Sequence, residues 1–238
     1  MRLERLDALR GAAIVWMVAF HFSFDLNLLG LMQPRQSFLT DPFWTAQRTA
    51  IVSLFLCCAG LGQAVALQAG QGWPRFWRRW AQVLGCALLV SAGSWWMFPR
   101  SWISFGVLHG MVVMLLAARL LAPLRAGLWP LALLALLLPQ WLGWAALDGR
   151  WGNWLGLVAH KPVTEDYVPV LPWLGVMLAG LAAGQWLLAR RPAWFTRPVP
   201  ALARPLLWLG QRPLRVYMLH QPLLLGLLHG GLWLRSAL

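Results

Sequence analysis

The sequence predicts an all-α fold: a polytopic bundle of about seven transmembrane helices with a cytoplasmic N-terminus, forming one integral membrane domain over residues 1–238. Of the 238 residues, 60% are hydrophobic and only 11% are charged. This composition has more apolar surface than one soluble core can bury. Several apolar runs reach the roughly 20 residues that a helix needs to cross a bilayer. Many of the 18 Trp residues lie near the ends of these runs, where interfacial belts form.

The predicted spans follow one another with short connections. They cover residues 8–31, 49–69, 78–98, 102–122, 127–147, 168–189 and 206–233. Because very short turns separate the third, fourth and fifth spans, we expect helical hairpins there. The longest polar intervals, at 32–48, 148–167 and 190–205, are too short to form a soluble domain and have the composition of loops.

The first span also has to be compared with a signal peptide, because a basic start precedes an apolar run. The run contains Arg10, His21 and Asp25, extends beyond a short apolar core and has no clear small-x-small cleavage site. We therefore interpret it as a retained transmembrane helix.

The distribution of Lys and Arg predicts the orientation. Twelve of them lie in the N-terminal segment and the loops on its side of the membrane, at 2–10, 75–79, 119–125 and 190–204. Six lie in the loops of the other side, at 35–48, 100, 150–161 and 235. Cytoplasmic loops carry the excess of positive charge, so the N-terminus is expected in the cytoplasm.

The net charge of +13 does not indicate nucleic-acid binding, because the basic residues are scattered between apolar runs. The three cysteines have neither a metal-binding spacing nor the pattern of a disulfide framework. Cys57, Cys58 and Cys86 are expected to be small packing residues.

Ionisable residues inside the first span are the strongest functional signal. On a helix, Arg10, His21 and Asp25 project from one face, because eleven residues make close to three turns and four residues make about one turn. Arg10 is expected near the cytoplasmic interface, with His21 roughly 16 Å deeper. Ionisable groups at such depth face a protein interior or a watery cavity and indicate a functional site. Asp25 is in position to orient His21 as a carboxylate orients a general base.

Other polar residues lie at comparable depth. His109, His220, Gln221 and Tyr217 are predicted to converge on the same cavity as substrate-binding groups, whereas His160 and His229 are expected to be solvated or interfacial. The loop at 148–167 is the largest on the outer side and is expected to face a substrate.

Five segments carry a family resemblance, in this order along the chain. They are RLERLDALRGAAIVWMVAFHFSFDLNLLG, IVSLFLCCAGLG, WISFGVLHGMVVMLL, YVPVLPWLGVMLAGLAAGQWL and WLGQRPLRVYMLHQPLLL. They resemble bacterial membrane proteins grouped with the catalytic domain of heparan-alpha-glucosaminide N-acetyltransferase. The ten residues between Arg10 and His21 also resemble the spacing of the wider superfamily of type-three membrane acyltransferases.

The resemblance implies a multi-pass enzyme of the bacterial cytoplasmic (inner) membrane. It would transfer an acyl group, acetyl above all, from cytosolic acyl-CoA to an amine or hydroxyl of a sugar or envelope glycan. His21 matches the histidine essential to the superfamily, Arg10 its arginine, and Asp25 the aspartate of the HFxxDL pattern. The donor substrate is acyl-CoA, and neither a metal nor haem is expected.

Two mechanisms are compatible with these residues. His21 acts either as a base for direct attack on the thioester or as a nucleophile that carries the acyl group. The phosphates of CoA favour cytoplasmic arginines, with Arg10 best placed and Arg75, Arg78 and Arg79 as further candidates or as simple topology signals.

Two other functions remain as alternatives. The first is a transporter or flippase for a small solute or lipid-linked sugar, because polar intramembrane residues also line permeation paths. A haem protein is disfavoured, because the histidines lie on separate helices without a repeated pair. Membrane lipid, acyl-CoA and a glycan acceptor are the expected partners, nucleic acid is not, and a homo-oligomer is compatible with the sequence.

Overall fold

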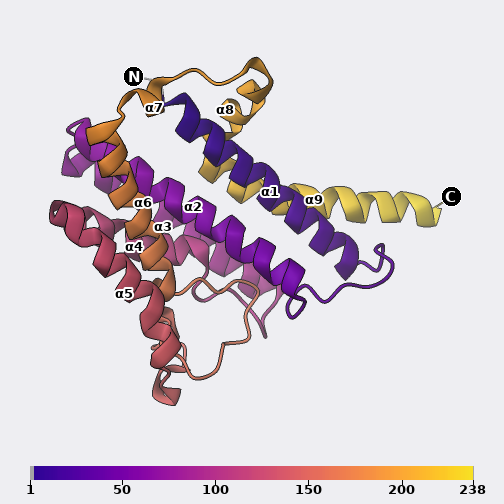
Figure 1. Cartoon of the computed structure of the whole chain (residues 1–238). Helices are drawn as coiled ribbons and strands as arrows, with labels where there is room; N and C mark the ends of the chain where they lie inside the picture. The colour runs from indigo at the N-terminus through magenta and orange to yellow at the C-terminus, as the bar shows by residue number, and fades with distance from the viewer. Residues whose placement is uncertain (1–2, 238) are drawn as a thin grey trace. The chain divides into compact units, whose positions relative to one another are not determined.

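The computed structural model describes residues 3–237, which form helices joined by turns and loops and contain no β-strand (Figure 1). The all-α prediction is therefore confirmed. The α-helices in this part of the chain are α1 (Glu4–Leu28), α2 (Pro42–Gln68), α3 (Trp73–Met97), α4 (Val107–Leu121), α5 (Leu128–Trp141), α6 (Val170–Arg190), α7 (Ala193–Thr196), α8 (Arg204–Gly210) and α9 (Pro213–Ala237).

A helix lies at each predicted span, although α4 and α5 have only 15 and 14 residues, and the number of crossings remains a prediction. Four helical stretches are long and apolar enough to cross a membrane: Glu4–Leu28, Pro42–Gln68, Val107–Trp141 and Val170–Arg190. Helices α3 and α9 are as long, but their Arg, His and Gln residues make them more polar. The cytoplasmic N-terminus also remains a prediction, and Arg2, which contributed to that argument, lies outside the described residues.

The prediction of one continuous helix over 206–233 was wrong. The chain forms two helices there, α8 and α9, which Gln211 and Arg212 separate. The cause is Pro213, which has no backbone N–H and therefore cannot continue the hydrogen-bond ladder of α8. A proline is well accommodated in the first turn of a new helix, and α9 begins at this residue.

The helices group into two compact units, with the boundary inside α2. The first unit comprises Met1–Phe55 and Phe195–Leu238, and the second comprises Leu56–Trp194. The single membrane domain predicted over 1–238 stays a prediction.

Aromatic packing fixes α1 in the first unit. Met17 and Phe20 of α1 are buried together with Phe38 and Ile51. The ring of Phe38 stacks on Trp44 with their centroids 3.9 Å apart, and the edge of Phe20 meets both rings. The aromatic cluster therefore orients the turn of α1 that carries His21.

Small residues bring α1 and α8 into backbone contact in the same unit. A Cβ at Gly11 would overlap the backbone of Leu206, and a Cβ at Gly210 would overlap the backbone of Asp7. Close approach through small residues is the usual way in which membrane helices pack, because lipid provides no hydrophobic drive between them. Helix α9 also packs against α1, and the two cross in Figure 1.

In the second unit, α6 packs against α4 and α5, and α3 packs against α4. The last of these contacts agrees with the expected hairpin of the third and fourth spans. Helices α2 and α6 also meet, because Gly60 lies against the backbone of α6 and Gly180 against the backbone of Cys57. The elements of this unit are separable in Figure 1, where α5 and α6 run side by side.

Candidate functional site

Two imidazole rings from opposite ends of the sequence meet in the first unit. His21 of α1 and His220 of α9 lie with their ring centroids 5.0 Å apart and their planes tilted by 60°. His220 is only 9% exposed. Within residues 3–237, His21 makes no hydrogen bond, so its two nitrogens remain available for chemistry.

Asp25 does not orient His21, which corrects the pairing expected from the spacing. The Asp25 carboxylate is buried, with 1% exposure, and accepts hydrogen bonds from the Gln221 side-chain amide at 2.8 and 3.0 Å. His21 and Asp25 do share one face of α1, as predicted, because they are four residues apart. That face meets α9 twice: His21 meets His220, and Asp25 meets Gln221.

The hydrogen bond of His220 determines its tautomer. Its Nδ1 lies 2.6 Å from the backbone carbonyl of Tyr217. Because a carbonyl can only accept, Nδ1 carries the hydrogen, and in the neutral ring Nε2 has a lone pair. This nitrogen is buried and has no hydrogen-bond partner among the described residues. Tyr217 contributes through its backbone, and its ring packs against the aromatic cluster.

Arg10 lies three turns before His21 on α1, as predicted. Its guanidinium donates to the Asp7 carboxylate, with Nη1 and Oδ1 3.3 Å apart. Both side chains are partly exposed, at 25% for Arg10 and 17% for Asp7. The separation along the helix, roughly 16 Å, prevents Arg10 and His21 from acting on the same atom.

Arg75, Arg78 and Arg79 are exposed and line one open pocket in the second unit. Its volume is about 480 Å³, and Gln71 and Gln82 contribute further polar groups. Residues 75, 78, 79 and 82 lie on one face of α3, because they are spaced by three or four residues. Three guanidinium groups around one cavity form an environment suited to an anion.

His109 also lies in the second unit, and both of its ring nitrogens are occupied. Nδ1 accepts from the backbone N–H of Gly106 at 3.2 Å, and Nε2 lies 3.0 Å from Ser91 Oγ. The Ser91 hydroxyl donates to the carbonyl of Ile103, so the His109 Nε2–H must donate to Ser91. Substrate binding by His109, which the sequence suggested, would require one of these bonds to break.

A model of the family Heparan-alpha-glucosaminide N-acetyltransferase, catalytic, matches residues 2–222. The chain belongs to this family. The match confirms the resemblance found in the sequence and includes α1 and the part of α9 that carries His220 and Gln221. No curated protein and no solved structure matches the chain.

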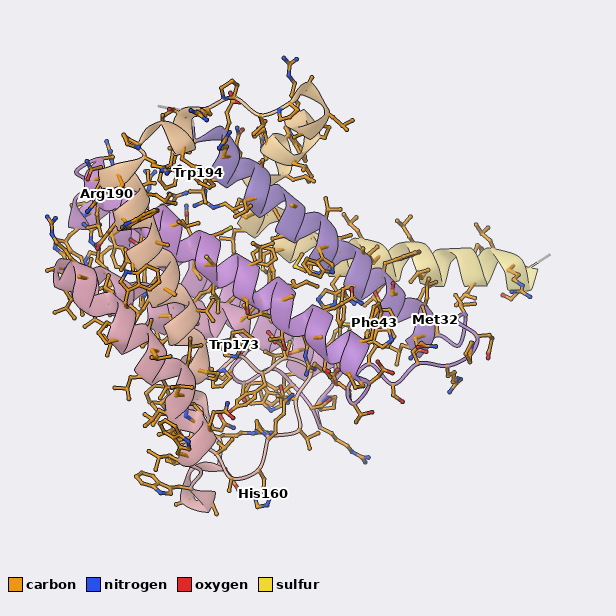
Figure 2. The ribbon with its side chains drawn as sticks, in the orientation of Figure 1. Met32, Phe43, His160, Trp173, Arg190 and Trp194 are labelled. Carbon is orange, nitrogen blue, oxygen red and sulfur yellow. The ribbon has the colours of Figure 1, made fainter. Side chains whose placement is uncertain are left out.

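The loop before α6, which the sequence predicted to face a substrate, is held by its own polar contacts. Asp148 accepts from the backbone N–H groups of Ala159 and His160 and from the His160 ring. The hydrogen bonds from His160, through its backbone first and then its ring, lower the pKa of Asp148. His160 is exposed, as predicted, and extends from this loop in Figure 2.

The end of this loop is tied to the turn between α3 and α4. Asp166 accepts from the Val107 N–H at 2.7 Å, and Glu165 accepts from the Ser101 hydroxyl. Tyr167 donates to the Asn153 carbonyl at 2.7 Å, and burial, followed by the charge of Asp148, raises its pKa to about 12. These carboxylates therefore hold the loop in place.

Sequence reasoning missed two features of the site. Arg119, which was counted as a topology signal, is buried; it donates to the Gln71 carbonyl and lies over the rings of Trp73 and Phe76. The hydrogen bond between Asp25 and Gln221 was also missed, since no spacing rule relates residues so far apart. Among residues 3–237, no three His, Cys, Asp or Glu side chains gather as a group that could hold a metal.

Proposed function

We propose that this protein is a membrane acyltransferase that moves an acyl group, acetyl above all, from acyl-CoA to an amine or hydroxyl of a sugar or envelope glycan. Membership of the N-acetyltransferase family carries the proposal, because the match covers residues 2–222. Residues 1–238 would act as one catalytic domain in a bacterial inner membrane, with the N-terminus in the cytoplasm. Acyl-CoA would then be taken from the cytoplasmic side.

The pair of His21 and His220 supports this chemistry. Acyl transfer from a thioester requires a group that removes a proton from the attacking amine or hydroxyl and a donor that stabilises the oxyanion. Two neutral imidazoles provide both, because each has one N–H and one lone pair. Their 5.0 Å separation allows both rings to contact one reacting group.

The arginines support binding of the donor. CoA carries several phosphate groups, and guanidinium groups bind phosphate through paired N–H donors. Arg75, Arg78 and Arg79 share one cavity and would hold these phosphates. Arg10, whose charge Asp7 partly balances, is assigned to the cytoplasmic end of the donor path.

The test is release of CoA thiol from acetyl-CoA by purified protein in nanodiscs, with glucosamine as the acceptor. We expect His21→Ala to lower the rate by at least about 100-fold, because losing either a general acid–base group or an oxyanion donor typically costs that much. Arg10→Ala should weaken binding of radiolabelled acetyl-CoA. His229→Ala is the control, since this histidine is exposed.

Folded wild-type protein that neither binds acetyl-CoA nor releases CoA would contradict the proposal. The transporter or flippase alternative predicts a different result: solute uptake into vesicles that contain the protein but no acyl-CoA. An active His21→Ala variant would leave the acyltransferase function in place and remove His21 from its mechanism.

A further inference from the structure

Two buried hydrogen-bond acceptors occupy successive positions of α9. They are Nε2 of His220 and Oε1 of Gln221, and neither has a partner among the described residues. Buried polar atoms in proteins are nearly always hydrogen-bonded, so such atoms call for an explanation, for example a ligand.

The roles of both atoms as acceptors follow from their neighbours. The Tyr217 carbonyl fixes the hydrogen of His220 on Nδ1, which leaves a lone pair on Nε2. The amide nitrogen of Gln221 donates to both oxygens of Asp25. A flipped amide would set its oxygen against those of the carboxylate, so Oε1 remains the unpartnered atom.

Both of these α9 side chains contact the same face of α1. His220 meets His21, and Gln221 meets Asp25, one helical turn further along. A group that binds here must supply hydrogen-bond donors. A thioester carbonyl supplies only acceptors, whereas an amine or a hydroxyl supplies N–H or O–H.

We propose that His220 Nε2 and Gln221 Oε1 bind the attacking amine or hydroxyl of the acceptor, and that His220 is the base that removes its proton. The inference rests on the proposed acyltransferase function and deepens it. His220 has what a general base needs: a free lone pair and a third group, the Tyr217 carbonyl, that orients the ring. His21 has no such orienting hydrogen bond.

The reaction balances with these two imidazoles. The acceptor oxygen or nitrogen forms a bond to the thioester carbon while its proton passes to His220 Nε2. His21 donates an N–H to the carbonyl oxygen as negative charge develops there. The intermediate collapses, the C–S bond breaks, and the CoA thiolate takes the proton back from His220. The products are the acylated acceptor and CoA thiol.

The experiment compares His220→Ala and His220→Gln with wild type in nanodiscs, measuring CoA release from acetyl-CoA with glucosamine or hydroxylamine. We expect kcat with glucosamine to fall at least about 100-fold in both variants. Hydroxylamine, a strong nucleophile that has less need of a base, should lose less than about tenfold. Added imidazole should restore His220→Ala, more strongly for imidazoles of higher pKa. The matched control is His229→Ala, because His229 also bonds a carbonyl of α9 through Nδ1 but is exposed.

The outcomes separate the inference from the function on which it rests. Wild type that releases CoA, together with a His220→Gln variant of similar rate, would overturn only the assignment of His220. Equal losses with both nucleophiles and no rescue by imidazole would make His220 a structural residue and also overturn it. Folded wild type that neither binds acetyl-CoA nor releases CoA overturns the acyltransferase function and the base together. Nitrogen-15 NMR of His220 gives a check independent of turnover: a protonated Nε2 in the neutral ring contradicts the inference.

Discussion

His109 and His220 lie on apolar helices of the two units and differ in what surrounds their rings. His109 accepts a hydrogen bond at Nδ1 and donates one at Nε2, so both nitrogens are occupied. His220 donates at Nδ1 and leaves Nε2 buried without a partner. The two neutral rings are therefore opposite tautomers.

This difference shows that residue type and depth do not identify a catalytic histidine. Both ring nitrogens of His109 are used in a hydrogen-bond network that joins α3, the following turn and the start of α4. His220 is oriented by its backbone hydrogen bond through Nδ1 and keeps a buried lone pair on Nε2, and its ring lies against that of His21. The hydrogen-bond partners of the two rings distinguish the two histidines.

The largest effect on stability is expected at Asp25, whose carboxylate on α1 is hydrogen-bonded to Gln221 on α9. Asp25→Ala removes both hydrogen bonds from Gln221 and leaves its amide buried and unpaired. The free energy of unfolding should fall by about 3 kcal/mol, the upper range for a hydrogen bond to a charged group. Equilibrium unfolding in detergent measures this loss. Asp25→Asn, which retains an acceptor, should lose less; equal losses would mean that the Gln221 contact is not the cause.

A smaller loss is expected for the His109 network. His109→Ala leaves the Gly106 N–H without its acceptor and removes the Ser91 contact, so the unfolding free energy should fall by about 2 kcal/mol. The rate of CoA release per folded molecule should stay within about twofold of wild type. Parallel unfolding and activity measurements provide the check. A loss of kcat in fully folded His109→Ala would place this histidine in catalysis and remove the contrast with His220.

Changes in the arginine-lined pocket should alter the affinity for acetyl-CoA. Exchanging Arg75, Arg78 and Arg79 together for Gln is expected to raise the KM for acetyl-CoA about tenfold, equivalent to about 1.4 kcal/mol, with kcat unchanged. Steady-state kinetics over a range of salt concentrations measures this change, and the variant should also lose salt dependence. The control exchanges Arg190, Arg191 and Arg197, which are exposed and do not line this cavity. An equal effect of both triple variants would indicate net charge alone.

Much of the fold could be predicted from the sequence because hydropathy and helix length are local properties. Each predicted span contains a helix, and exposed Trp95 and Trp96 lie in the last turn of α3, as expected near a span end. The break before α9 was missed, although Pro213 carries the signal for it. The number of crossings, predicted as about seven, stays a prediction, because α3 and α9 combine a suitable length with several polar residues.

The candidate site was predictable only in part. Helical spacing correctly places His21 and Asp25 on one face, but it cannot say which partner each side chain meets. Asp25 bonds Gln221, nearly two hundred positions away in the chain, and that choice depends on how α1 and α9 cross. The division between His109 and His220 depends on single hydrogen atoms, which no sequence pattern specifies.

The smallest effect is expected in the loop before α6, where Asp148 resembles His109 in having its polar atoms occupied. Its folded pKa lies below the ordinary value of about 3.9, because His160 and Ala159 donate hydrogen bonds to its carboxylate. The carboxylate therefore stabilises the loop above about pH 4, and this contribution is lost as the pH falls through the lowered pKa. Hydrogen exchange at the Ala159 and His160 amides should become faster in acid relative to the unstructured rate. In Asp148→Asn the protection should not change with pH, since the amide oxygen accepts the same bonds without titrating. Protection in wild type that is equally independent of pH would mean that these backbone contacts do not depend on the charge of Asp148.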